Sequence, residues 1–140
     1  EKHIAGMLRK YGENAELTNM MAEHLFHFNP IHGRSIIEAK PWLEKSRELD
    51  PQNQESLRHL ADIAWVENDV ETIRKIMAEA PSESPLWVDN RLRILALQDS
   101  VTEVQLKEVV AHPKFTIFHI TFKFVVGRCD NPCIASNIFL

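Results

Sequence analysis

Apolar residues recur along most of the chain at spacings of three and four, which is the period of a helix buried on one face. The pattern predicts helices over residues 16–28, 34–48, 54–67 and 70–79, preceded by a shorter helix that Gly12 ends. The stripe of the second helix consists of Leu17, Met20, Met21, His24, Leu25 and Phe28. These elements predict an all-α protein.

Turn signals separate the predicted helices. Pro51 ends the third helix, and Asn53 can cap the fourth. Asn68 tolerates a left-handed backbone, and Asp69 can cap the helix that follows. Pro41 lies inside the third pattern, so it kinks that helix or begins a new one at its first turn. Such short connections predict antiparallel neighbours.

The fourth predicted helix has the clearest buried stripe, formed by Leu57, Leu60, Ala61 and Ala64. We expect Leu60 to be almost fully buried. Its replacement by alanine would then cost about 2–5 kcal/mol of stability.

The joints between helix pairs recur, because Pro51 and Pro85 are 34 residues apart (85 − 51 = 34). Segment 51–85 resembles a tetratricopeptide repeat. The matching positions are Leu57, Leu60 and Ala61 in the first helix, Asn68-Asp69 at the turn, Ala80 in the second helix and Pro85 at the close. Residues 39–51 resemble the second helix of a preceding repeat, although Pro41 is foreign to the pattern, and residues 86–113 can hold a third pair.

The resemblance implies a short, right-handed solenoid of stacked helix pairs over residues 1–113, because a lone pair cannot bury its apolar face. It also implies that the first helix of each pair lines the concave surface. On the fourth helix this leaves Arg58, Asp62 and Trp65 as partner-binding residues, since Trp and Arg are enriched at interface hot spots. The alternative for Trp65 is a core position between repeats.

Charge and composition favour a protein partner. The net charge of −4 provides no electrostatic attraction to nucleic acid or to an anionic membrane. No apolar stretch approaches the roughly 20 residues that span a bilayer. The two cysteines, Cys129 and Cys133, are too few for a disulfide framework, which favours a reducing, cytoplasmic location.

Motifs for catalysis are absent from the sequence, which lacks a phosphate-binding glycine loop, a GxSxG elbow and an HExxH pair. We therefore expect no enzymatic activity and no cofactor. Glu23, His24, His27 and His32 lie close together in sequence, and Cys129, Cys133 and His119 form a second set with ligand chemistry. Packed or solvated side chains explain both sets, so no metal site is predicted.

Residues 114–140 form a separate C-terminal segment, rich in apolar side chains between 115 and 126. Its β-branched and aromatic residues favour a strand, yet Phe115, Phe118 and Phe122 also satisfy a helical stripe. The segment either covers the open end of the solenoid or recruits another chain, including a second copy in a homodimer.

Two functions follow from these observations. The favoured one is a protein–protein interaction module that binds a peptide or helix of a partner, as a separate protein or as part of a larger one. The alternative is a metal-binding or redox protein that uses a His or Cys cluster on a helical scaffold.

Overall fold

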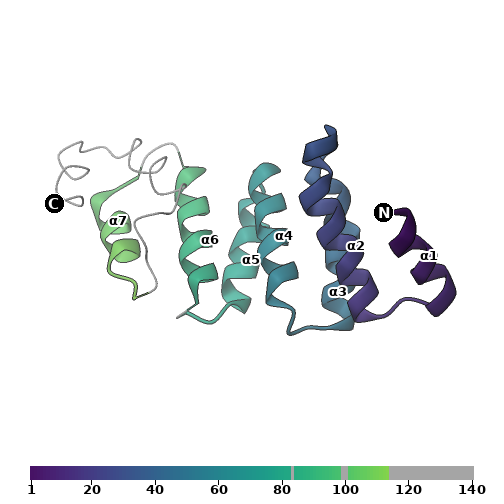
Figure 1. Ribbon diagram of the computed structural model, residues 1–140. Coiled ribbons are helices and arrows are strands. Elements are labelled where there is room, and N and C mark those ends of the chain that lie inside the picture. The colour runs from purple at the N-terminus through teal and green to yellow at the C-terminus, as the bar shows by residue number, and fades with distance from the viewer. Residues whose placement is uncertain (83, 99–100, 114–140) are drawn as a thin grey trace. The chain divides into compact units, whose positions relative to one another are not determined.

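The computed structural model describes residues 1–82, 84–98 and 101–113 (Figure 1). Within these ranges the chain forms helices and no β-strand, which confirms the all-α class. The α-helices are α1 (Lys2–Tyr11), α2 (Ala15–Phe28), α3 (Lys40–Leu49), α4 (Gln54–Val66), α5 (Val70–Glu79), α6 (Pro85–Ala96) and α7 (Glu103–Val110). The C-terminal segment predicted to be strand or helix, and with it the proposed dimer contact, lies outside the described residues.

The chain divides into two compact units, Glu1–Glu67 and Asn68–Leu140, and each is described by itself. The boundary falls at the Asn68 turn, inside the segment that resembles a tetratricopeptide repeat. Stacking of successive helix pairs into a solenoid therefore stays a prediction. No helix among the described residues is long and apolar enough to cross a membrane.

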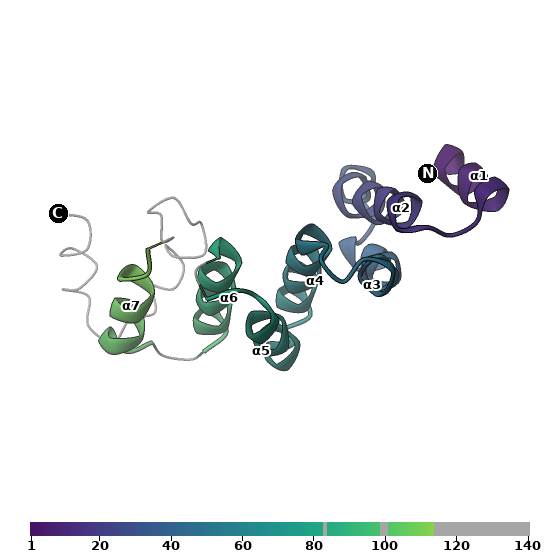
Figure 2. The same cartoon turned by 90° about the horizontal axis from the view of Figure 1, so that it is seen from below.

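The first unit is built on α2, which packs against α1 and α3, while α3 also packs against α4 (Figure 2). Its core consists of Met21, Ala22, Leu25, Ala39, Leu43 and Ile63, with Ile4, Leu8, Trp42 and Leu60 partly buried around it. α2 and α4 therefore present their core-facing residues to the same group of apolar side chains.

The third predicted helix begins later than expected, at Lys40 instead of residue 34. Pro41 lies in its first turn, where proline is tolerated because the missing N–H has no intrahelical partner. Two short 3-10 helices, Pro30–His32 and Ile36–Ala39, fill the preceding stretch. Of the two roles considered for Pro41, the structure confirms the start of a new helix.

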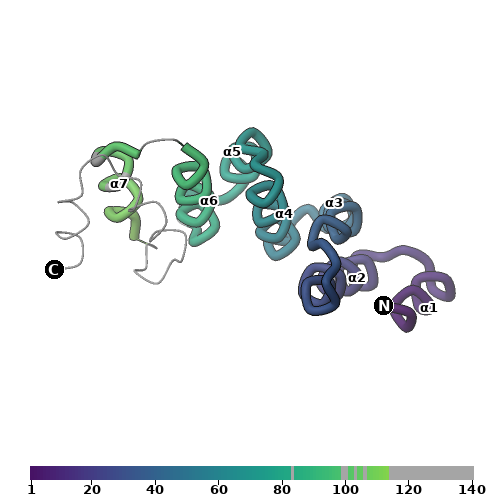
Figure 3. The backbone as a smooth tube through the Cα atoms, turned by 90° about the horizontal axis from the view of Figure 1, so that it is seen from above, coloured from purple at the N-terminus to yellow at the C-terminus, as the bar shows by residue number. Residues whose placement is uncertain are grey.

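The predicted caps and turn are confirmed. The side chain of Asn53 accepts a hydrogen bond from the backbone N–H of Ser56, and that of Asp69 accepts one from Thr72. Asn68 has a φ of 58°, which is left-handed. These signals place the start of α5 at the predicted residue, Val70. Figure 3 shows α5 as the helix that follows α4 along the backbone.

The predicted burial of Leu60 is wrong, because its side chain is only partly buried. Leu60 packs against the core of the first unit and is not one of its buried residues. The fully buried residues of α4 are instead Ser56, Leu57, His59, Ala61, Ile63 and Ala64.

The second unit has a core of its own on α6 and α7. It consists of Val88, Leu92, Leu95, Ala96, Val101 and Val109, and α5 packs against α6. Within residues 86–113, which can hold a third helix pair, Leu92, Leu95 and Val109 are thus buried, whereas Val104 is exposed.

Candidate functional site on helices α2 and α4

The predicted partner-binding residues Arg58, Asp62 and Trp65 all lie on α4, at spacings of four and three, and all remain partly exposed. They therefore share one face of the helix. Nothing in the fold tests whether that face binds a partner.

Arg58 is engaged with its own helix. Its guanidinium forms an ion pair with Glu55, one turn earlier, and Nε donates a hydrogen bond to Glu55 Oε2 at 3.1 Å. This hydrogen bond lowers the pKa of the Glu55 carboxyl and raises the pKa of Arg58. Arg58 thus presents a paired, partly exposed charge.

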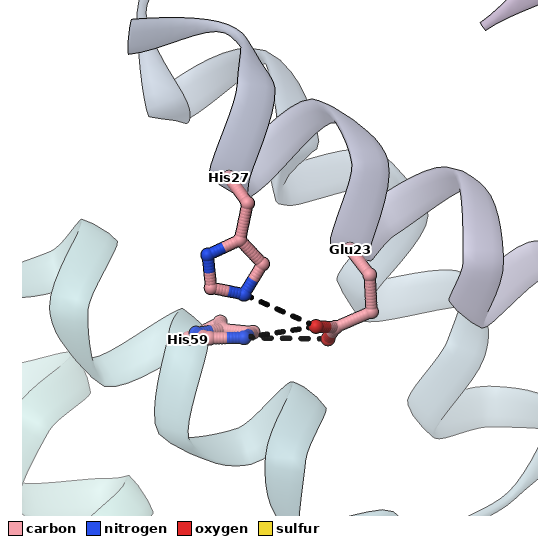
Figure 4. A group of neighbouring side chains, drawn as sticks. All are labelled: Glu23, His27 and His59. Carbon is pink, nitrogen blue, oxygen red and sulfur yellow. Dashed lines mark hydrogen bonds and ion pairs between the residues drawn. The ribbon is translucent and has the colours of Figure 1, made fainter. Parts of the chain in front are cut away.

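His59 is a functional candidate that the sequence pattern does not reveal. Its side chain is completely buried, although its sequence neighbours Arg58 and Leu60 are only partly buried. The ring stacks on Phe26 of α2, with centroids 3.8 Å apart. Nε2 lies 3.3 Å and 3.4 Å from the two carboxylate oxygens of Glu23, as Figure 4 shows.

Glu23 and His27 complete the site from α2. They are four residues apart and thus on adjacent turns, and His27 Nε2 lies 3.3 Å from Glu23 Oε2. In Figure 4 both imidazoles point toward this one carboxylate. Glu23, His27 and His59 each offer a ligand atom, and these atoms lie within 4.8 Å of one another.

The burial of the three residues is graded. His59 is enclosed, Glu23 is partly buried, and the His27 side chain is 51% exposed. Glu23 Oε1 and His59 Nδ1 are buried and form no hydrogen bond within the described part of the chain. Nδ1 of His59 instead faces Asp62 Oδ2 at 3.6 Å, which is beyond hydrogen-bond length.

Two of the three residues belong to the histidine-rich stretch noted in the sequence, and two members of that stretch are elsewhere. His24 stacks on Phe28, and His32 lies exposed in the first 3-10 helix. The other predicted set, Cys129, Cys133 and His119, lies outside the described residues.

Apolar periodicity does not point to His59, but the spacing of acidic and histidine residues relates it to the pair on α2. Glu23 and His27 are separated by three residues, and Glu55 and His59 repeat that spacing on α4. In the fold Glu55 Oε1 lies 3.5 Å from His59 Nε2. The two Glu-x-x-x-His pairs therefore meet at one place.

Comparison of the chain with protein-family models, with curated proteins and with solved structures finds no match. The likeness to the tetratricopeptide family consequently depends on the residues of this sequence alone, most of all on segment 51–85.

Proposed function

We propose that this chain is a protein–protein interaction module, built as a tetratricopeptide-like solenoid, that holds a peptide or helix of a partner against α4. The observation that carries the proposal is Trp65. This large apolar residue remains partly exposed on a helix whose opposite side is already occupied by buried residues.

The surroundings of Trp65 suit a peptide. The Arg58–Glu55 pair and Asp62 lie on the same side of α4 and provide donors and acceptors for a polar backbone. An aromatic residue beside such groups has the composition of an interface hot spot, in which Trp and Arg are enriched. The partner we expect is a protein segment with an apolar side chain that packs on the indole.

A second function is favoured by a separate observation, the convergence of Glu23, His27 and His59. It corresponds to a metal-binding protein on a helical scaffold. The two groups of residues adjoin on α4, because Asp62 and Glu55 lie 3.6 Å and 3.5 Å from the ring of His59.

The test of the interaction module is a double variant, Arg58→Ala with Trp65→Ala. A partner captured by the wild-type chain and identified by mass spectrometry should bind this variant about tenfold more weakly or worse. The melting temperature should change by only a few degrees, since neither residue belongs to an apolar core of the described structure.

The matched control removes one arginine and one apolar side chain from other exposed positions, Arg74→Ala with Ile31→Ala. It should leave binding unchanged. Unfolding of the Arg58/Trp65 variant would place Trp65 in the core. Normal folding with unchanged affinity would refute the α4 surface.

A further inference from the structure

We propose that Glu23, His27 and His59 bind one divalent transition-metal ion, with Zn²⁺ as the best fit. The proposal goes beyond the interaction module, because it concerns a different set of side chains and a different ligand. It rests on the geometry, burial and chemistry of these three residues.

The geometry approaches that of a tetrahedral site. Two ligand atoms that are each 2.0–2.1 Å from a zinc ion lie about 3.3 Å apart. One oxygen of Glu23, Oε2, is 3.3 Å from His27 Nε2 and 3.4 Å from His59 Nε2. Because all three ligand atoms already lie within 4.8 Å of one another, side-chain shifts of about 1–2 Å bring them to the spacing of a tetrahedral zinc site.

The donor set selects the class of ion. Two imidazole nitrogens and one carboxylate oxygen are ligands that zinc and its transition-metal neighbours accept, whereas calcium and magnesium prefer oxygen alone. Ions that prefer thiolate ligands are disfavoured, because none of these three residues carries a sulfur atom.

Burial supplies an independent reason for a ligand. Glu23 Oε1 and His59 Nδ1 are buried polar atoms without a hydrogen-bond partner in the described structure, which is energetically unfavourable. A cation bound between Glu23 and Nε2 of His59 compensates the carboxylate charge.

Asp62 fits the same arrangement. A histidine that binds metal through one ring nitrogen usually donates the N–H of the other to a carboxylate or carbonyl. Asp62 Oδ2, at 3.6 Å, lies on the Nδ1 side of His59, opposite the nitrogen that faces Glu23. If Asp62 Oδ2 moves slightly closer, it accepts a hydrogen bond from Nδ1–H of His59. This bond would fix the proton on Nδ1 and leave Nε2 free to bind the ion.

The fourth coordination position belongs to water. Glu55 lies nearby, 3.5 Å from His59 Nε2, but Arg58 holds its carboxylate in an ion pair. His27 is half exposed, so the ion enters from solvent on that side. Once bound, it links two helices, α2 and α4, whose ligands are 36 residues apart in sequence.

The experiment is zinc binding to the full chain in a Cys129→Ser/Cys133→Ser background, which removes the thiols as competing ligands. Calorimetric titration with ZnCl₂, checked by elemental analysis, should give one ion per chain with a dissociation constant below about 10 μM. The melting temperature should rise with zinc concentration, because the ion binds only the folded arrangement.

His27→Ala is the decisive variant, because His27 is exposed and its loss spares the core. It should bind zinc at least about tenfold more weakly and melt at the wild-type temperature without zinc. His32→Ala removes an exposed histidine outside the cluster and should bind zinc as the parent does.

Three results would overturn the proposal. One is the absence of stoichiometric zinc binding at micromolar concentrations. Another is unchanged affinity in His27→Ala, and the third is an equal loss in His32→Ala, which would assign the ion to other residues.

Discussion

The imidazole of His59 is completely buried, and its surroundings explain how the fold accommodates two polar nitrogen atoms there. Burying such a group is unfavourable unless it finds polar partners. Phe26 covers one face of the ring, and Glu23 lies within ion-pair distance of Nε2. The residue thus belongs to the packing of α2 against α4 as much as to a binding site.

The different burial of two leucines leads to a prediction. Leu43 is completely buried in the core of the first unit, whereas Leu60 packs partly exposed against its edge. Leu43→Ala should therefore cost about 2–5 kcal/mol of unfolding free energy, and Leu60→Ala only about 1–2 kcal/mol. Urea denaturation of both variants measures the difference. A cost for Leu60→Ala as large as that for Leu43→Ala would mean that α4 is rotated in solution.

The apolar pattern places residues on a face but does not rank burial within it. Leu60 lies in the middle of the predicted stripe of α4, yet its exposure depends on how far the neighbouring side chains reach. His59 is polar and nevertheless buried, because it packs against Phe26 and Glu23 of another helix. Contacts of this kind are tertiary and leave no periodic trace in the sequence.

Among the helices of the first unit, a partly buried polar network joins α2, α3 and α4. Asn19 Oδ1 accepts hydrogen bonds from Asn53 Nδ2 at 2.9 Å and from Ser56 Oγ at 3.1 Å. Asn53 Nδ2 also donates to Ser46 Oγ at 3.1 Å. Asn53 thus caps α4 through its oxygen while its nitrogen ties that cap to both neighbouring helices.

This double role makes the cap formed by Asn53 different from the one that Asn14 forms at the start of α2. Asn14 caps α2 through one exposed hydrogen bond to Leu17, so Asn14→Ala should cost about 1 kcal/mol. Asn53→Ala removes a cap and also the two hydrogen bonds that its Nδ2 donates to Asn19 and Ser46, so we expect a cost of about 2–3 kcal/mol. Chemical denaturation of the two variants compares them. Equal costs would show that the network contributes nothing beyond the cap.

The elements themselves could largely be predicted from local chemistry. Asn53, Asn68 and Asp69 act within their own turns, so their effects are visible in sequence, and α5 has the predicted bounds. The 3-10 helix Ile36–Ala39 was not predicted, because periodicity does not separate it from the first turns of an α-helix. Of the candidate site, the sequence indicates Glu23 and His27 on α2, whereas the contribution of His59 from α4 appears only in the fold.

At the scale of the molecule, each of the two units has a hydrophobic core of its own. The core of the first unit uses α2, α3 and α4, and that of the second uses α6, α7 and Val101 before α7. Repeat proteins commonly show such division, since each unit is stabilised by its nearest neighbours in sequence. The boundary between the units falls at Asn68, inside segment 51–85.

Separate cores predict separate opening. Leu43→Ala should accelerate amide hydrogen exchange about tenfold or more at buried positions of α2, such as Met21 and Leu25, because it lowers the stability of the unit that contains them. The exchange of Val88 and Leu92 in α6 should keep its wild-type rate, since their core contains no residue of the first unit. Leu92→Ala should give the reverse pattern. Equal acceleration in both units by either variant would show that the chain opens as one cooperative body, and the stability of each half could then not be treated alone.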